Sequence, residues 1–326
     1  MTSIKKPEMR ICRLGLVFAL ATLCGEPTIA GGIGVLGDSY SDEYQFYPPH
    51  RSTARNWVEI LAETRGLDFG PMSESSRDEP RNAGFAYNWA RSNASSSDLI
   101  ASGQHTGLAA QMARGEVSIA VVFIGGNDVI HALHASSPSS ALEGLGRRAS
   151  KNVTIAVEAI LSASPEAKVL LVTVPDVRDL PEFRVPVRDG SLDRAVADAA
   201  AAELDVINTE IRKIARSNPR VALLDFARIT RISSYLAPET LSIAGHRVDR
   251  ISPGDSVDHL FLADVRHLGT VGQGVFAKMV VDTLNTKLGT KIPPLIDREI
   301  ITFAERVNSS IAASEPIAQK TNAQGQ

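Results

Sequence analysis

The chain is poor in cysteine, in aromatic residues and in long apolar runs. Its two cysteines, Cys12 and Cys24, both lie in the first thirty of 326 residues, so the remainder can form no disulfide and depends on core packing. Aromatic residues make up 5% of the chain. With a formal net charge of −3 and a pI near 6.2, the chain lacks the basic surface that binds nucleic acid. No internal repeat or low-complexity block is present, which argues against a repeat architecture.

The first thirty residues differ in composition from the rest. Basic residues at positions 5, 6, 10 and 13 precede the apolar run 14–24, and small residues follow at 28–31. This pattern predicts a secretory signal peptide over residues 1–30, and therefore a secreted or periplasmic protein. The run is shorter than the roughly 20 residues that span a bilayer, so a membrane helix is the weaker alternative. A lipid anchor on Cys24 is also less favoured, because the bulky Leu23 precedes it.

The remaining sequence has the composition of one globular domain with a short C-terminal extension. Hydrophobic residues make up 44% and charged residues 22% of the chain, which suits a protein with a substantial core. We expect this domain over residues 31–293, ending at Pro293-Pro294. In the extension, 294–326, a peripheral helix is expected over 296–311, and the polar residues 314–326 are expected to be disordered.

Strand-like and helix-like segments alternate along the domain. The apolar runs 117–124, 168–174 and 221–226, together with the strand that leads into Ser39, have the character of buried parallel strands. Helical periodicity is seen between and after them, at 54–65, 98–114, 139–161, 191–214 and 272–284. The polar segment 70–82 predicts a loop, and 241–248 an extra β segment. The order predicts an α/β protein with a three-layer α/β/α sandwich and a doubly wound parallel sheet.

The sequence Gly37-Asp38-Ser39 follows a small apolar strand at its carboxyl end. In open α/β sheets, ligands bind at this edge, where strands end and helices begin. Ser39 is therefore a candidate nucleophile, and Asp38 is expected to bond the backbone around the turn. Because the tripeptide is common by chance, its weight depends on finding a base, a carboxylate and oxyanion donors elsewhere.

Two later segments supply those groups. Gly125-Gly126-Asn127-Asp128 follows the second strand, and the Asn127 side chain offers an N–H₂ donor for an oxyanion. Asp264 stands three residues before His267, so its carboxylate can fold back onto the imidazole Nδ1 and leave Nε2 free to accept a serine proton. The alternative interpretations are helix capping by Asn127 or Asp128, and an exposed capping pair formed by Asp264 and His267.

These blocks, in this order, resemble those of the SGNH, or GDSL, hydrolase superfamily over most of residues 33–285. The resemblance implies a flavodoxin-like fold and no cofactor. It implies Ser39 as nucleophile, His267 as general base and then acid, and Asp264 as its orienting carboxylate. The oxyanion donors that it implies are the Ser39 amide, Asn127 Nδ2 and a backbone amide from a further block. The Val174–Val177 run also resembles a loop of lipase-like members.

The further block departs from the family pattern. Residues 88–95 match its outline, but Asn93 stands where the family has a donor glycine. Asparagine tolerates positive φ and keeps its N–H, so the donor can survive. The added side chain is expected to narrow the pocket. After His267, Leu268-Gly269 stands where relatives often have proline, and we expect little chemical effect there.

Other polar and aromatic clusters have two interpretations each. Three of the five tyrosines lie in the loop after Ser39, which predicts either a substrate platform or packing that anchors the loop. On the first interpretation, the substrate-binding residues are Tyr40, Tyr44 and Gly126. No metal is expected, because the cluster at 255, 258 and 259 lacks a closed ligand set. His131 and His134 either reach the cleft or lie on a helix surface.

The sequence thus predicts a secreted serine esterase that needs neither metal nor other cofactor. Its expected partner is a small-molecule or polysaccharide ester, with small acyl or carbohydrate esters favoured because no long apolar lid segment is evident. Lipid esters are the alternative within this class. A non-catalytic carbohydrate-binding relative is the alternative outside it, which the departure at Asn93 makes conceivable. The oligomeric state is left open.

Overall fold

A computed structural model describes residues 31–74, 83–237 and 239–314. The main sheet has four parallel strands, β1 (Gly32–Gly37), β4 (Val117–Phe123), β5 (Lys168–Val172) and β6 (Val221–Leu224), in the order β1-β4-β5-β6. The predicted α/β class and parallel sheet are confirmed. The expected signal peptide, part of the expected loop and the residues after 314 lie outside the described residues.

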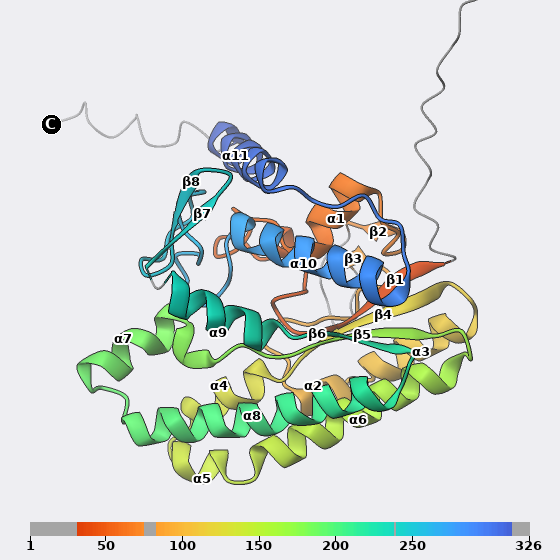
Figure 1. The fold of residues 1–326 in the computed structure, drawn as a ribbon, viewed down its shortest axis with the longest axis horizontal. Coiled ribbons are helices and arrows are strands. Elements are labelled where there is room, and N and C mark those ends of the chain that lie inside the picture. The colour runs from red at the N-terminus through yellow and green to blue at the C-terminus, as the bar shows by residue number, and fades with distance from the viewer. Residues whose placement is uncertain (1–30, 75–82, 238, 315–326) are drawn as a thin grey trace, which may run out of the picture.

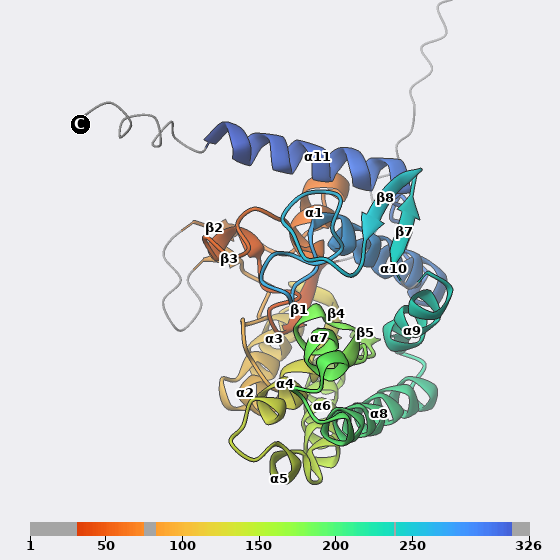
Figure 2. The same ribbon diagram turned by 90° about the vertical axis from the view of Figure 1, so that its left-hand side faces the viewer.

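Helices cover both faces of the sheet and make the three layers (Figure 1). One face carries α3 (Gln104–Ala113), α6 (Leu145–Ala163) and α8 (Arg194–Ser217). The other carries α1 (Trp57–Arg65) and α10 (Thr270–Leu288), and α11 (Asp297–Ser314) packs outside α10. Figure 2 shows the same division from the side. Because both faces are covered, β1 and β4 have almost no exposed residue, as their apolar sequences predict.

A short extended segment continues the sheet beyond the free edge of β1. Asn88 forms a parallel bridge with Val35, and the Trp89 amide donates to the Val35 carbonyl at 2.9 Å. The Arg91 amide then donates to the Gly37 carbonyl at 3.1 Å. This pairing brings the segment around Asn93 to the carboxyl end of β1, beside the Ser39 turn.

The remaining elements refine the predicted ones. The helix expected over 98–114 divides at Gly103 into α2 (Ser96–Ala101) and α3, and that over 139–161 divides at Gly144 into α5 (Pro138–Leu142) and α6. The segment expected to be β forms a hairpin. Two helices that the pattern does not predict, α7 and α9, follow β5 and β6. The other bounds are α4 (Gly126–Leu133), α7 (Pro181–Asp189), α9 (Phe226–Leu236), β2 (Met72–Ser73), β3 (Gly84–Phe85), β7 (Thr240–Ile243), β8 (His246–Asp249) and the short turns Tyr44–Phe46 and Val177–Asp179.

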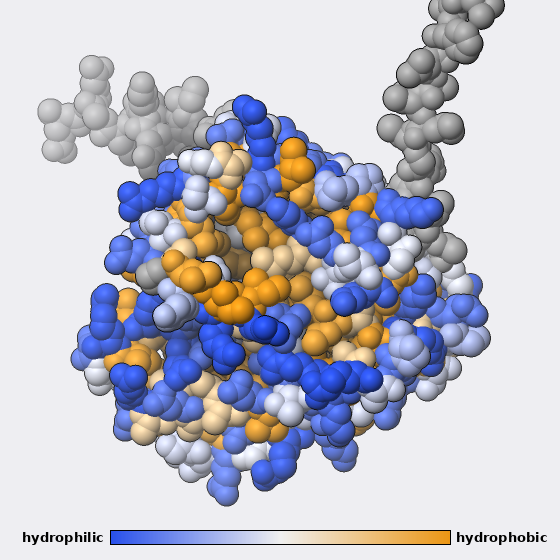
Figure 3. Space-filling model, in the orientation of Figure 1, coloured by the Kyte–Doolittle hydropathy of each residue, from blue (hydrophilic) through white to orange (hydrophobic). Residues whose placement is uncertain are grey.

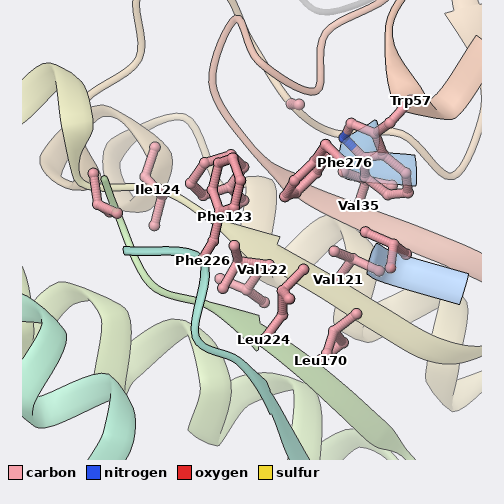
Figure 4. Packing of buried hydrophobic residues seen from close by; sticks show 14 of the residues in the cluster. Val35, Trp57, Val121, Val122, Phe123, Ile124, Leu170, Leu224, Phe226 and Phe276 are labelled. Carbon is pink, nitrogen blue, oxygen red and sulfur yellow. The ribbon is translucent and has the colours of Figure 1, made fainter. Parts of the chain in front are cut away.

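Three phenylalanines pack together where the strands end (Figure 4). The ring of Phe276 on α10 stacks on Phe123 at 5.3 Å between centroids and lies 4.9 Å from the ring of Phe226. The rings come from β4, α9 and α10, so the cluster joins the sheet to the helices on that face, and Phe123 also contacts the ring of Tyr40 next to Ser39. None of the described helices is both long enough and apolar enough to span a membrane.

Candidate active site

Ser39 lies at a tight turn directly after β1. The turn begins at Gly37, where an added Cβ would lie 2.6 Å from the Phe123 carbonyl oxygen, so no side chain fits. The Asp38 carbonyl accepts from two amides further along the turn, each at 3.0 Å, and Asp38 Oδ1 accepts from the Tyr40 amide at 3.0 Å. Asp38 therefore bonds the backbone around the turn, as expected. Its burial raises its pKa to about 7.

The structure brings Ser39, His267 and Asp264 into one chain of contacts. Ser39 Oγ lies 2.7 Å from His267 Nε2, and His267 Nδ1 lies 2.5 Å from Asp264 Oδ2. Asp264 Oδ1 also accepts from the His267 amide at 2.9 Å. The carboxylate folds back onto the imidazole as the three-residue spacing predicts. The His267 side chain is only 13% exposed, and α10 begins after it without a side-chain cap, so the capping alternative is not what the structure shows.

The charges of this pair favour a neutral imidazole that can accept a proton. Burial alone would raise the pKa of Asp264, but hydrogen bonds from the His267 ring and backbone outweigh it and lower the pKa to about 2. Burial also lowers the pKa of His267, and the nearby carboxylate only partly opposes this. An ionised Asp264 can only accept, so it selects the tautomer with hydrogen on Nδ1. His267 Nε2 is then the acceptor that faces Ser39.

The turn that carries His267 has strained backbone. Val265 has φ of 64°, a left-handed conformation that a β-branched residue rarely adopts. Its carbonyl accepts from the Glu182 amide at 3.1 Å. The Glu182 carboxylate also accepts from Arg266 Nε at 2.6 Å and lies 2.9 Å from His134 Nε2. The helix α7 thus holds the turn by its first residues, through a contact that the sequence analysis misses.

The predicted oxyanion donors come from the Ser39 turn, from the segment around Asn93 and from the start of α4. Asn93 has φ of 68°, the conformation expected where the family has glycine. Within the described chain, the amides of Ser39 and Asn93 have no hydrogen-bond partner. Asn127 is 4% exposed, and its Nδ2 donates one hydrogen to the Ala94 carbonyl at 3.1 Å, which leaves the second.

The Asn93 side chain is exposed and lies outside the lining of the cleft at Ser39. Its Oδ1 lies 2.9 Å from His131 Nε2 on α4. The expected narrowing of the pocket is therefore corrected, because the side chain turns toward solvent and this exposed histidine. The neighbouring Asp128 caps another helix rather than its own, because it accepts from the Ser96 amide and hydroxyl at 2.7 and 2.6 Å.

The aromatic loop divides into a residue at the cleft and residues that anchor it. Tyr40 lines the cleft, and its hydroxyl donates to the Arg266 carbonyl at 2.8 Å. Tyr44 is fully buried, and its hydroxyl accepts from Gln273 Nε2 at 2.7 Å. Tyr47 donates to Asp42. The substrate contact expected of Tyr44 is therefore corrected: its ring packs edge-on against His267 instead, 6.0 Å between centroids.

A buried arginine that the sequence analysis misses supports the nucleophile. Arg51 is 4% exposed, and its Nη1 donates to the Ser39 carbonyl at 3.1 Å. Its Nη2 donates to Ser92 Oγ at 2.5 Å, and its guanidinium lies 4.0 Å from the centre of the Tyr47 ring. It therefore ties the Ser39 turn to the segment that precedes Asn93. A lone arginine after Pro48-Pro49 carries no local signal of this role.

A cleft of about 50 Å³ opens at Ser39. Gly126, Asn127, Tyr40 and Arg266 line it, together with apolar residues such as Phe123 and Ile130. The predicted substrate residues Tyr40 and Gly126 thus face this space. In the expected solvated loop, Asp255 Oδ1 accepts from the Ala263 amide at 2.9 Å, and His259 Nδ1 lies 2.8 Å from the Ser252 carbonyl. Over the described ranges, no group of acidic, His or Cys side chains has the arrangement of a metal site.

A comparison of the sequence with models of protein families gives one match. A model described as the GDSL-like lipase/acylhydrolase family matches residues 35–254, which include Ser39 but end before Asp264. No curated protein matches the sequence. Similar solved structures include a lipase from a goat-rumen metagenome, with 12% identity over 78% of this chain and 97% of that chain and a TM-score of 0.47. An extracellular lipase from Streptomyces rimosus has 18% identity over 78% of this chain and 100% of that chain, with a TM-score of 0.44. A family 3 carbohydrate esterase from Clostridium thermocellum has 14% identity over 78% of this chain and 94% of that chain, with a TM-score of 0.41.

Proposed function

The chain belongs to the GDSL-like lipase/acylhydrolase family and is an ester-bond hydrolase, and on that premise we propose that it works through an acyl-enzyme on Ser39. The observation that carries the proposal is the distance of 2.7 Å between Ser39 Oγ and His267 Nε2, with Asp264 behind the imidazole. A serine hydroxyl is a weak nucleophile until an adjacent base takes its proton, and this arrangement provides that base.

The proposed reaction has two halves. Ser39 Oγ attacks the ester carbonyl carbon while its proton passes to His267 Nε2, which gives a tetrahedral oxyanion. The bond to the alcohol oxygen then breaks, and His267 returns the proton to the departing alcohol. A water molecule then attacks the acyl carbon while His267 takes one of its protons. The bond from that carbon to Ser39 Oγ breaks, His267 returns the proton to Oγ, and the carboxylic acid is released. Asp264 stays ionised and stabilises the imidazolium in both halves.

Three donors are proposed for the oxyanion: the amides of Ser39 and Asn93 and the second hydrogen of Asn127 Nδ2. Donors that no protein group occupies can bind developing negative charge without first losing a partner. The Arg91 amide bonded to Gly37 supports the placement of the Asn93 turn beside Ser39. Because Asn93 keeps its N–H in left-handed backbone, the departure from glycine leaves this donor in place, which supports a working enzyme over a non-catalytic binding relative.

The substrate class and the compartment complete the proposal. The sequence favours small acyl or carbohydrate esters, whereas an apolar cavity beside the site favours esters with a hydrocarbon chain. The composition of residues 1–30 supports export from the cytoplasm.

The direct test replaces the nucleophile. Ser39→Ala should lower kcat for p-nitrophenyl acetate by at least about 10⁴-fold, because no other group forms the acyl-enzyme. Ser309→Ala on the exposed face of α11 is the matched control and should keep the wild-type rate. A fluorophosphonate probe should label wild type and the control but not Ser39→Ala. Equal rates in wild type and Ser39→Ala would remove the proposal.

The pH dependence tests His267 as the base. Only neutral imidazole can accept the Ser39 proton, so kcat/KM should rise with pH through the pKa of the free enzyme's base. Because burial lowers the pKa of His267 from its usual 6.5, the half-maximal point should lie below pH 6.5. Activity should then be full at neutral pH and decline as pH falls. A half-maximal point well above pH 7 would contradict this assignment.

A further inference from the structure

An apolar cavity of about 130 Å³ lies between α9, α10 and the loop before His267. Its walls include Phe226 and Ile229 from α9, Val275 and Met279 from α10, and Phe261 from the loop. Figure 3 shows a hollow on this face, flanked by an apolar patch. These apolar side chains come from elements that also contribute to the core, so the cavity is an apolar space between the core and the solvent.

The cavity shares a wall with the cleft at Ser39. Tyr40, Pro175, Asp176 and Leu180 line both spaces. In addition, the chain neighbours of the two reacting residues line the cavity, Tyr40 after Ser39 and Leu268 after His267. The Tyr40 ring packs edge-on against Phe123 at 5.8 Å and its hydroxyl is held by the Arg266 carbonyl, so this ring forms the partition.

The polar side chains around the cavity are largely engaged within the protein. Arg250, 5% exposed, donates from Nη1 to the Ala237 carbonyl at 2.6 Å and from Nη2 to Ser234 Oγ at 2.7 Å. Only its Nε, which solvent does not reach, has no partner within the described chain. Thr230 donates to the Phe226 carbonyl at 3.0 Å. The space is therefore better matched to a hydrocarbon than to the many hydroxyls of a sugar.

The surface beside the cavity is also apolar. Of the eight large hydrophobic residues that are exposed in the described chain, four lie on α9: Ile229, Ile232, Tyr235 and Leu236. Ile229 is at once a cavity wall and part of this surface. A substrate that approaches along α9 therefore meets apolar side chains first, which a hydrocarbon chain tolerates better than a carbohydrate does.

We propose that this cavity binds a hydrocarbon chain of the ester substrate, with Tyr40 as the partition that the chain passes to reach Ser39. The inference rests on the proposed esterase function and names its substrate class. Dry apolar cavities of about 150 Å³ accept benzene, so this one suits a chain of roughly six carbons. The chain belongs either to the acyl group or to the alcohol, and the test separates the two.

The first measurement is kcat/KM against chain length in two series. One series varies the acyl group of p-nitrophenyl esters from acetate to dodecanoate, and the other varies the alcohol of acetate esters from ethyl to decyl. A buried methylene contributes about fourfold in binding, so the hexanoyl ester or the hexyl ester should exceed its two-carbon counterpart by at least about tenfold. The series that shows the rise identifies the side of the ester. A fall with length in both series, in an enzyme that hydrolyses acetate esters, overturns the inference.

Variants that fill the cavity test its location. Val275→Phe adds volume to the α10 wall and should lower the six-carbon to two-carbon ratio by at least about tenfold. Val206→Phe makes the same exchange on an exposed position of α8, on the other face of the sheet, and should keep the wild-type ratio. If Val275→Phe fails to fold, Ser233→Leu fills the cavity from α9. An unchanged ratio in a folded cavity variant contradicts the inference.

Binding of hexan-1-ol separates this inference from the proposed reaction. Titration calorimetry with the Ser39→Ala protein should show binding with a negative heat-capacity change, and Val275→Phe should weaken it at least about tenfold. Binding together with a complete lack of ester turnover in wild type would defeat the proposed function but leave the cavity assignment standing. Turnover of acetate esters without hexan-1-ol binding would defeat the cavity assignment alone.

Discussion

The turn that carries Asn93 and the turn that carries His267 share an unusual backbone conformation but differ in how their polar groups are bonded. Asn93 and Val265 both have left-handed φ, and they are two of the three such non-glycine residues in the described chain. On the His267 side, side chains bond the turn tightly: Asp264 accepts from two backbone amides and faces the imidazole. On the Asn93 side, by contrast, the Asn93 amide itself has no hydrogen-bond partner among the described residues.

The difference follows from what each turn is proposed to do. A base must hold one orientation and one tautomer, which needs many bonds to it. An oxyanion site must offer N–H donors that have no acceptor until negative charge develops on the substrate. The backbone must therefore fix the position of these donors without forming hydrogen bonds to them. Strained or unpaired groups persist only where the surrounding structure fixes them, and here Arg51 and α7 do so from outside both turns.

The largest effect should come from the base side. Asp264→Asn keeps the shape of the side chain but can donate to Nδ1, which favours the wrong tautomer, and should lower kcat by about 10⁴-fold. Loss of the carboxylate should also move the half-maximal pH lower, because Asp264 raises the pKa of His267. Asp255→Asn, on the preceding loop, is the matched control and should keep wild-type kcat. A loss below about tenfold would show that this carboxylate is not the orienting group.

A smaller effect should come from the oxyanion side. Asn127→Ala removes one donor and should lower kcat by about 10²–10³-fold with little change in KM, because the lost interaction forms with the transition state. It also removes the bond to the Ala94 carbonyl, which should lower the free energy of unfolding by about 1 kcal/mol. Kinetics and urea unfolding on the same preparations separate the two. An intact kcat with reduced stability would make Asn127 a structural residue only.

The contrast also explains what the sequence could predict. The placement of Ser39, Asn127, Asp264 and His267 was predictable because each lies in a short block at the end of a strand or beside a helix. Their roles stay those that the family resemblance implies. The parallel sheet followed from apolar strands alternating with helices. The split helices were less predictable, because single glycines at 103 and 144 decide them within otherwise helical patterns.

Contacts between distant segments that belong to no motif could not be predicted. Glu182 supports the His267 turn from α7, a helix with Pro186 inside it that no periodicity indicates. Arg51 reaches the Ser39 carbonyl from a loop without a motif. The burial of Tyr44 depends on Gln273, more than two hundred residues away in the chain. The apolar cavity arises from three separate elements and has no signature in any one of them.

The smallest expected effect is the change in stability when a residue with left-handed backbone is replaced by glycine. Left-handed backbone at a β-branched residue destabilises the folded protein by roughly 1–3 kcal/mol. Glycine removes this strain but lowers stability by roughly 0.4–1 kcal/mol, because it increases the conformational entropy of the unfolded chain. Val265→Gly should therefore raise the free energy of unfolding by about 1 kcal/mol, while Asn93→Gly should change it by only a few tenths, since asparagine tolerates this conformation. Ala244→Gly, at the third such position, in the β7–β8 hairpin, is a control away from Ser39.

Activity should divide these glycine variants differently from stability. Asn93→Gly keeps its amide and should stay within about threefold of wild-type kcat/KM, whereas Val265→Gly should lose several-fold, roughly 1 kcal/mol, because a freer turn holds His267 less firmly. Urea unfolding measures the change in stability, provided that the m-value stays unchanged, and steady-state kinetics measure the change in kcat/KM. A Val265→Gly protein that is both less stable and fully active would mean that Glu182 and Asp264, rather than valine in a strained conformation, define the His267 turn. A large loss in Asn93→Gly would instead assign the asparagine side chain, through its contact with His131, a role in holding the donor amide.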